Sequence, residues 1–273
     1  MQQSRAQKPT ISIVIPALNE ARNLERILPT LPAVHEVILV DGNSIDDTVI
    51  TAQRVLPEIV VVQQARRGKG NALACGFERA TGDIVVMFDA DGSSNPDEIP
   101  AFVGALLAGA DFAKGSRFCH GGASLDITPF RRAGNSALNR IANRMFGTAF
   151  TDLCYGYNAF WADILPSLAL PRNATTGSES TLTSWGDGFE IETLLNCRVA
   201  GLGLVVVEVP SIENLRVFGA SNLNAIRDGL RVLRTLLVER RALLRRSTTY
   251  SSEPAHDAVA GSVFDDGRAE QAA

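Results

Sequence analysis

The stretch Ile84–Ser94, IVVMFDADGSS, places two aspartates directly after a run of apolar residues. Side chains alternate along a strand, so Asp89 and Asp91 would share one face if the strand continued through them, while Ala90 would point away. Two carboxylates this close repel each other unless a positive partner or a hydrogen-bond network holds them. We therefore expect a divalent cation at the end of a buried strand.

Other short apolar runs resemble this one, and each precedes a segment with helical spacing. Continuous apolar strands that alternate with helices indicate a parallel sheet covered on both faces. The expected fold class is α/β, with a mostly parallel central sheet and helices on both faces. In the first half, strands are expected at 11–16, 36–42, 59–64 and 83–91, and helices are expected to begin near residues 19, 45, 68 and 95.

The second half is less regular. The polar, glycine-rich segment 174–188 is most simply a mobile loop, and the tail from Ser247 is poor in large apolar residues. We expect one domain over 10–246 between disordered ends at 1–9 and 247–273. The expected strands are 111–118, 154–161 and 202–210, and the expected helices are 129–147, 189–201 and 222–246.

Composition places the chain among soluble globular proteins. It has 273 residues, of which 45% are hydrophobic and 21% charged, values typical of a protein with a full core. The net charge of −4 provides no overall electrostatic footprint for nucleic acid. The polar N-terminus does not resemble a signal peptide, and no apolar run is long enough to span a bilayer. We expect a cytoplasmic protein whose membrane contact, if any, is peripheral and at the inner face.

Several motifs follow one another in a recognisable order. They are IVIPALNEARNL, VDGNSIDDT, GKGNAL, DADGS, GSRF, FEIETLL and RVFGASNL. In order and spacing they resemble family 2 glycosyltransferases of the GT-A fold, in particular the branch of dolichol-phosphate mannose synthase and other polyprenyl-phosphate glycosyltransferases. The resemblance extends from Ile11 to about Arg240. It implies a nucleotide-binding half at 10–110 and an acceptor-binding half at 111–246.

The resemblance identifies Asp89 and Asp91 as the family's DXD motif, which holds Mg²⁺ or Mn²⁺ on the donor diphosphate. The chemistry agrees, because hard divalent cations prefer carboxylate oxygens. The residues alone also allow a turn in which both aspartates cap a helix at Pro96, and they allow Asn19 to be a helix N-cap. The implied nucleotide-sugar residues are Pro16, Ala17, Asn19, Glu20, Asp41, Gly42, Lys69, Gly70, Asp89, Ala90 and Asp91.

The acceptor side rests on basic residues. Arg132 and Ser136 lie one helical turn apart and share a face. Asn222 stands where the family often has lysine. Each arginine taken alone is also compatible with an ordinary surface residue. By resemblance, the residues that hold an acceptor phosphate are Arg117, Arg132, Ser136, Arg216 and Ser221.

Three acidic residues in GDGFEIETLL leave two mechanisms open. A hydroxyl acceptor needs a general base, for which Asp187 and Glu190 are the candidates beside the catalytic Asp91. A lipid phosphate is already an anionic nucleophile and needs no strong base. Residue alternation around Phe189 suggests that Glu192 is structural.

The final expected helix is amphipathic. Its arginines outnumber its only acidic residues, Asp228 and Glu239. An apolar stripe with flanking arginines is typical of a helix at an anionic membrane surface, but the stripe would also suit packing on the protein's own core. The stripe consists of Leu223, Ile226, Leu230, Leu233 and Leu237, and the flanking arginines are Arg227, Arg231, Arg234, Arg241 and Arg245.

The expected function is metal-dependent, inverting transfer of a sugar from a GDP- or UDP-sugar to a polyprenyl or dolichyl phosphate. The alternative is transfer to a soluble hydroxyl acceptor in natural-product or polysaccharide biosynthesis. A sugar-nucleotide pyrophosphorylase is disfavoured because PALNEA replaces its glycine-rich, arginine-containing loop. A non-catalytic nucleotide-binding module is disfavoured by the intact aspartate pair. No nucleic-acid partner is expected, and a homo-oligomer remains an open alternative.

Overall fold

The structure is a computed structural model that describes residues 5–171, 185–219 and 225–250. Ser221 and most of the loop expected at 174–188 lie outside these ranges, as do the first residues of the chain and residues 251–273.

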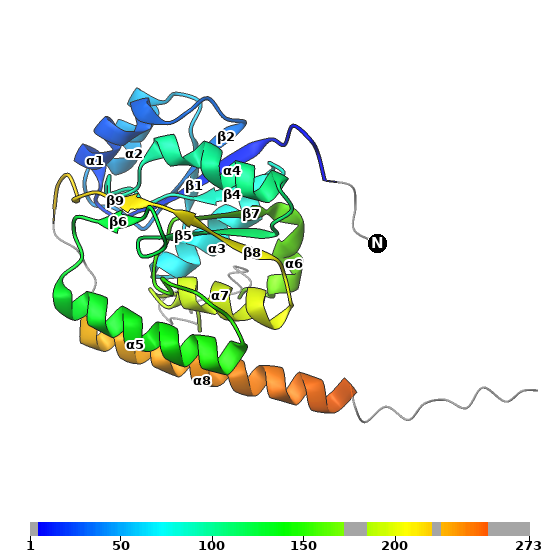
Figure 1. Cartoon of the computed structure of the whole chain (residues 1–273). Coiled ribbons are helices and arrows are strands. Elements are labelled where there is room, and N and C mark those ends of the chain that lie inside the picture. Colours follow the sequence, from blue (N-terminus) through cyan, green and yellow to red (C-terminus); the bar gives the residue numbers. More distant parts are fainter. Residues whose placement is uncertain (1–4, 172–184, 220–224, 251–273) are drawn as a thin grey trace, which may run out of the picture.

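The molecule is built on a seven-stranded sheet in the order β3-β2-β1-β4-β7-β5-β8 (Figure 1). Neighbouring strands are parallel except for β7, which runs antiparallel between β4 and β5. The expected α/β fold is therefore confirmed. The strands are β1 (Ile11–Ala17), β2 (Glu36–Asp41), β3 (Val60–Gln63), β4 (Ile84–Met87), β5 (Phe112–Ser116), β7 (Asn158–Trp161) and β8 (Val206–Pro210), and a second small sheet pairs β6 (Ala123–Ser124) with β9 (Ile212–Glu213).

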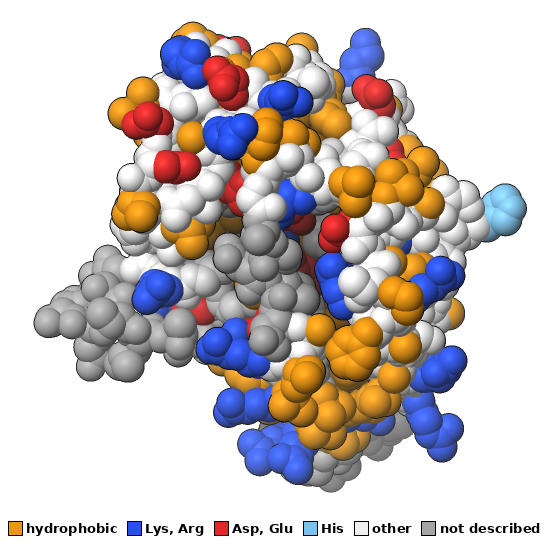
Figure 2. All heavy atoms as spheres, turned by 90° about the vertical axis from the view of Figure 1, so that its left-hand side faces the viewer, with side chains coloured by type: hydrophobic (Ala, Val, Ile, Leu, Met, Phe, Trp, Pro, Cys, Tyr) orange, Lys and Arg blue, Asp and Glu red, His pale blue; other side chains and the backbone are white. Residues whose placement is uncertain are grey.

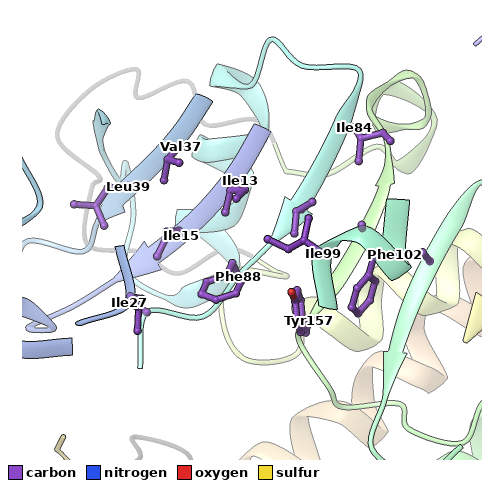
Figure 3. Close-up of a cluster of buried hydrophobic side chains, with 14 of the residues drawn as sticks. Ile13, Ile15, Ile27, Val37, Leu39, Ile84, Phe88, Ile99, Phe102 and Tyr157 are labelled. Atoms are coloured by element: carbon purple, nitrogen blue, oxygen red, sulfur yellow. The ribbon is translucent and has the colours of Figure 1, made fainter. Parts of the chain in front are cut away.

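One face of the sheet is covered by α1 (Ala21–Ile27), α2 (Thr48–Val55) and α4 (Ile99–Leu107). Side chains that alternate along β1 and β2 supply the sheet side of this core, because successive residues of a strand point to opposite faces. Figure 3 shows part of the cluster, including Ile13, Ile15, Val37, Leu39, Phe88, Ile99, Phe102 and Tyr157.

The other face is covered by α3 (Lys69–Arg79), the short α6 (Leu165–Leu168) and α7 (Ile191–Gly201). A further layer, α5 (Pro129–Phe146) and α8 (Ala225–Tyr250), packs on the outside of α7 (Figure 1). Because α7 lies between the sheet and this outer pair, it is buried nearly all round and is not amphipathic. Single 3₁₀ turns occur at Leu28–Thr30, Pro96–Glu98 and Ala162–Ile164.

Three expectations about boundaries were wrong. Strand β4 ends at Met87, so Asp89 and Asp91 lie in the turn after the strand and their common direction does not come from strand alternation. Helix α8 continues through residues 247–250, which were expected to be disordered. The N-terminal segment is held from Arg5 onward, because its guanidinium forms ion pairs with Asp111 at 2.7 Å and with Asp163 at 2.9 Å.

A pair of helix glycines tests how closely α3 packs on the sheet. A Cβ atom at Gly76 would lie 2.3 Å from Cγ1 of Val14, whereas a Cβ at Gly104 of α4 would meet nothing within 4 Å. We predict that Gly76→Ala lowers the free energy of unfolding by about 1–3 kcal/mol through overpacking. Gly104→Ala should raise it by about 0.5–1 kcal/mol, because alanine is the better helix former. Urea denaturation measures both, and a stabilising Gly76→Ala would contradict the packing.

Candidate active site

The carboxyl ends of β1, β2 and β4 open onto a cavity of about 820 Å³. Ligands of open α/β sheets bind at this edge. Near the middle of the face in Figure 2 lies a hollow in which acidic and basic side chains are visible. The sequence-predicted residues that line the cavity are Pro16, Ala17, Glu20, Gly42, Lys69, Asp89, Ala90, Asp91, Arg117 and Arg216.

Lys69 connects two carboxylates inside this cavity. Its Nζ atom lies 2.7 Å from Oδ1 of Asp89 and 2.9 Å from Oε1 of Glu192. Burial alone would lower the pKa of Lys69, but the two carboxylates outweigh burial and raise its pKa above the ordinary value. Lys69 is therefore a fixed positive charge in the cavity wall.

Asp91 has a basic partner of its own. Nη2 of Arg216 lies 2.8 Å from Oδ2 of Asp91, and Nη1 donates to Oε1 of Glu20 at 2.9 Å. The other carboxylate oxygen of Asp91 accepts hydrogen bonds from the backbone N–H of Ser93 at 2.9 Å and from its hydroxyl at 2.6 Å. The two aspartates are thus held apart from each other by separate basic residues, each of which also contacts a second carboxylate.

The segment that carries Arg216 is fastened across the aspartate turn. The N–H of Val217 donates to the carbonyl of Asp91 at 3.1 Å, and the N–H of Phe218 donates to Oδ1 of Asn23 at 3.0 Å. The Phe218 ring also stacks under the guanidinium of Arg22, 3.9 Å from the ring centroid. These contacts to the aspartate turn and to α1 fix the backbone that carries Arg216.

Asn19 and Asp41 do not line the cavity, and they shape its loops instead. Asn19 has a positive φ of 59°, and its side-chain oxygen accepts from the N–H of Ile45 at 2.8 Å, so the expectation of a helix N-cap was wrong. The carboxylate of Asp41 accepts from the N–H groups of the turn that follows it and from the amide of Gln63. The capping alternative for Asp89 and Asp91 was also wrong, because Asn95 caps the turn at Pro96.

The glycines on both sides of Lys69 admit another part of the chain. A Cβ atom at Gly68 would lie 2.0 Å from the carbonyl oxygen of Asp187, and one at Gly70 would lie 1.8 Å from that of Gly186. The Asp187 carbonyl accepts from the N–H of Gly70 at 2.8 Å and that of Asn71 at 3.2 Å. The GKG motif therefore lets residues 186–188 pack on the first turn of α3.

The two base candidates lie beside this contact and do not line the cavity. The Asp187 carboxylate forms two hydrogen bonds of 2.8 Å with the guanidinium of Arg66, and both side chains are largely buried. Glu190 is also buried, and its Oε1 accepts weakly from the N–H of Gly188 at 3.3 Å. A base role for Asp187 would require Arg66 to release it.

Only some of the predicted acceptor residues line the cavity. Arg117 lines the cavity, but its buried guanidinium is held by Asp152 at 2.6 Å and Glu213 at 3.0 Å, and it stacks on Tyr155. Arg132 is exposed and does not line the cavity, and Ser136 is half-buried and also outside it. The neighbouring Arg131, which the sequence did not single out, lines the cavity instead. The described acceptor-side arginines at the cavity are therefore Arg117, Arg131 and Arg216.

One end of the cavity is apolar. Its lining residues come from α5, from α8 and from the loop before α5. The apolar residues that line this end are Ile127, Phe130, Leu138, Ile226, Leu230, Val232 and Leu233. The cavity thus has a highly charged end and an apolar end.

Comparison with known protein families agrees with the geometry. Residues 12–168, more than half of the chain, match the family model described as glycosyl transferase family 2. The chain belongs to glycosyl transferase family 2. As a member of that family it is a glycosyltransferase that uses a nucleotide-activated sugar, and the resemblance drawn from its motifs is confirmed.

Relatives of this glycosyltransferase act on lipid phosphates. It is 32% identical over 228 residues to a polyprenol monophosphomannose synthase of Mycolicibacterium smegmatis, with 78% of this chain and 80% of that protein covered. It is 32% identical to an undecaprenyl-phosphate mannosyltransferase of Micrococcus luteus, with 77% and 86% covered. It is 30% identical to a dolichol-phosphate mannosyltransferase of Pyrococcus furiosus, with 78% of this chain but only 59% of that protein covered.

Among solved structures, the family 2 chain resembles a glucosyl-3-phosphoglycerate synthase of Mycobacterium tuberculosis, determined in complex with Mn²⁺ and UDP. The TM-score is 0.64 at 25% identity, with 85% of this chain and 80% of that one covered. The likeness confirms the GT-A-like fold. That enzyme's product, glucosyl-3-phosphoglycerate, comes from a soluble acceptor, so the fold alone does not separate lipid from soluble acceptors.

Glu192 and Arg66 are the main site residues that sequence reasoning missed. Glu192 lines the cavity and contacts Lys69, whereas it had been interpreted as structural. A signal was present in the sequence: Glu192 interrupts a helix of mostly apolar residues, and a buried carboxylate requires a partner. Arg66 lies far from Asp187 along the chain, and no local pattern pairs them.

Asp187 could act as a general base, or it could have a positioning role in which its ion pair with Arg66 holds residues 186–188 against α3. Substitutions in the Arg66–Asp187 pair distinguish these two roles. We predict that Arg66→Met and Asp187→Leu each lower the free energy of unfolding by about 3 kcal/mol, because each removes one partner of a buried ion pair. The double variant should lose less than the two single losses added together. Thermal or urea denaturation measures all three. If Asp187→Asn abolished turnover without any loss of stability while Arg66→Met stayed active, a base role would be favoured over this positioning role.

Proposed function

We propose that this glycosyltransferase transfers a hexose from a GDP- or UDP-sugar to a polyprenyl phosphate, with inversion at the anomeric carbon and with Mg²⁺ or Mn²⁺ as cofactor. The observation that carries the proposal is the single cavity that joins the charged end around Asp89 and Asp91 to an apolar end between α5 and α8. A polyprenyl phosphate has the same two-part character, since its phosphate is charged and its tail is apolar.

The donor end fits a metal-bound diphosphate. The side chains of Asp89 and Asp91 line the cavity and remain 27% and 18% exposed, so their oxygens are accessible. The part of the chain that the structure describes contains no group of three or more acidic, histidine or cysteine side chains placed to hold a metal. Asp89 and Asp91 would hold a divalent cation together with oxygen atoms of the donor. Such a cation neutralises charge that develops on the leaving diphosphate.

The protein's own residues supply the remaining electrostatics. Lys69 and Arg216 place two positive charges beside the aspartates, where they can stabilise the departing diphosphate. An oxygen of the lipid phosphate attacks the anomeric carbon as the bond to the donor diphosphate breaks, and the bonding electrons leave with the nucleoside diphosphate. A single displacement of this kind inverts the anomeric centre. No strong base is needed, which agrees with Asp187 and Glu190 lying off the cavity.

The proposed acceptor implies a location. No helix in the described ranges of the chain is long and apolar enough to cross a membrane. We place the enzyme in the cytoplasm and peripherally at the inner face of the membrane, where a polyprenyl phosphate would be reached. The alternative, a soluble hydroxyl acceptor, keeps one specific support, namely the structural likeness to a glucosyl-3-phosphoglycerate synthase.

The first experiment concerns the metal. We predict that Asp91→Asn lowers kcat/KM by more than about 100-fold, because loss of an outer-shell partner alone typically costs 10–100-fold. It should also abolish the Mn²⁺ dependence of nucleoside-diphosphate binding in calorimetry. Asp97→Asn is the matched control, since Asp97 is exposed and outside the cavity. Persistent metal dependence in Asp91→Asn would contradict the assignment.

The second experiment concerns the acceptor. Purified enzyme with Mn²⁺ and labelled GDP- or UDP-sugars should transfer label to undecaprenyl phosphate in detergent. Leu230→Gln should raise KM for that lipid about tenfold or more, because it removes apolar contact with the tail. Ile50→Gln is the control, since its side chain is as exposed, at 66% against 64%, but lies on α2. Transfer to 3-phosphoglycerate and none to the lipid would replace this proposal by the soluble-acceptor alternative.

A further inference from the structure

Helix α8 presents a different face to the protein from the one that its apolar stripe predicts. The side chains that pack inward are Asp228, Val232, Thr235, Leu236 and Glu239, all of them buried. Three of the four described members of the stripe identified in the sequence point outward instead: Ile226 is 67% exposed, Leu230 64% and Leu237 46%, while Leu233 is half-buried. The interpretation that this stripe packs on the protein's own core was therefore wrong. The outward stripe is an apolar surface that the described fold leaves uncovered.

Helix α5 lies beside α8 and is organised in the same way (Figure 1). Its inward side chains include Asn135, Asn139 and Ala142. Phe130 and Ile141 point outward and are 66% and 38% exposed. The two helices together form one outward face, here called the α5–α8 face, with apolar side chains along both helices.

The α5–α8 face carries charge of one sign. The sequence of the two helices contains eleven arginines, four in α5 and seven in α8, and only two acidic residues, Asp228 and Glu239. Of the arginines whose side chains the structure describes, seven are exposed. Both acidic residues are buried, and Glu239 binds Arg198 at 3.1 Å while Asp228 contacts Arg231 at 3.4 Å. Among the described residues of the two helices, no acidic side chain is therefore exposed. In the lower part of Figure 2, hydrophobic side chains gather between Lys and Arg side chains.

This distribution is opposite to that of the whole chain, whose net charge is −4. An arginine-only rim around an apolar stripe is complementary to an anionic bilayer, where apolar groups enter the headgroup boundary and arginines meet lipid phosphates. Nucleic acid would also attract the arginines but would leave the exposed leucines and Phe130 without a partner.

We propose that the α5–α8 face docks on the surface of an anionic phospholipid bilayer. Phe130, Ile226 and Leu230 are exposed on this face and also line the active-site cavity. Docking therefore sets the apolar end of the cavity against the membrane, so that a lipid tail reaches it without crossing water. The role of docking in catalysis rests on the proposed function, because it assumes a lipid acceptor. Docking itself can be measured as vesicle binding, without any acceptor.

The test uses the full chain and vesicles of phosphatidylcholine with or without phosphatidylglycerol. The protein should float with the anionic vesicles at low salt, stay unbound with the neutral ones, and be released as salt rises. The variant Arg144→Gln, Arg227→Gln, Arg241→Gln removes three exposed charges from the face and should weaken binding about 100-fold. The variant Leu237→Ser, Leu244→Ser removes two exposed apolar side chains and should weaken binding at all salt concentrations.

The matched control is Lys8→Gln, Arg54→Gln, Arg79→Gln, which removes the same charge from exposed positions outside α5 and α8. It should bind vesicles as the unmodified protein does. Equal losses in both triple variants, or no binding to anionic vesicles at low salt, would overturn the proposal. Binding to duplex DNA or RNA in preference to the vesicles would overturn it in favour of a nucleic-acid partner.

The outcome is separable from that of the proposed function. The arginine variant should still transfer sugar to a short, water-soluble prenyl phosphate at the unmodified rate, since Arg144, Arg227 and Arg241 do not line the cavity. Vesicle binding without any lipid-phosphate transfer would refute the proposed acceptor and leave the docking face intact. Transfer to the short acceptor without vesicle binding would refute the docking face alone.

Discussion

The charged contact between Lys69, Asp89 and Glu192 is the interaction on which the cavity depends. Each partner comes from a different part of the fold: Lys69 begins α3, Asp89 follows β4, and Glu192 lies in the first turn of α7. A lysine in this position would lose its charge through burial if it stood alone, and a buried Glu192 would be equally unfavourable. Together the three charges are stable, and they connect α3 and α7, which cover the same face of the sheet, to the turn that carries Asp89 and Asp91.

The backbone around Lys69 explains how its charge is placed. Gly68 has a φ of 122°, and at both Gly68 and Gly70 a Cβ atom would collide with the carbonyls of residues 186–187. The carbonyl of Asp187 accepts two N–H groups of the first turn of α3, while its carboxylate holds Arg66. The glycines thus allow the segment 186–187 to pack directly on the backbone at the start of α3. Residues 186–188 therefore fix the helix that presents the lysine, and through it the charged end of the cavity.

Sequence reasoning recovered the parts that depend on local pattern. The apolar strands are continuous because both faces of the sheet are covered, and so the parallel α/β fold and the edge carrying Asp89 and Asp91 followed from it. It could not show that β7 is antiparallel, because that depends on which strands meet across the sheet. It also missed Arg66 and Glu192, whose partners are distant in sequence, and it chose Arg132 over Arg131, since a one-residue difference on a helix turns the side chain by about 100°.

Helix α8 shows why periodicity alone could not assign the outer layer. Its leucine stripe satisfies the helical pattern of a core-facing helix, but the face that packs inward contains Asp228 and Glu239, which are acceptable there because Arg231 and Arg198 are within reach. Burying both acids leaves the outward face positive, beside a cavity whose far end is rich in carboxylates. Under the proposed function, an anionic acceptor is attracted at the α5–α8 end of the cavity and meets Asp89 and Asp91 where Lys69 and Arg216 offset their charge. The placement of these few ion pairs, more than the net charge of the chain, determines how charge is distributed between the α5–α8 face and the cavity.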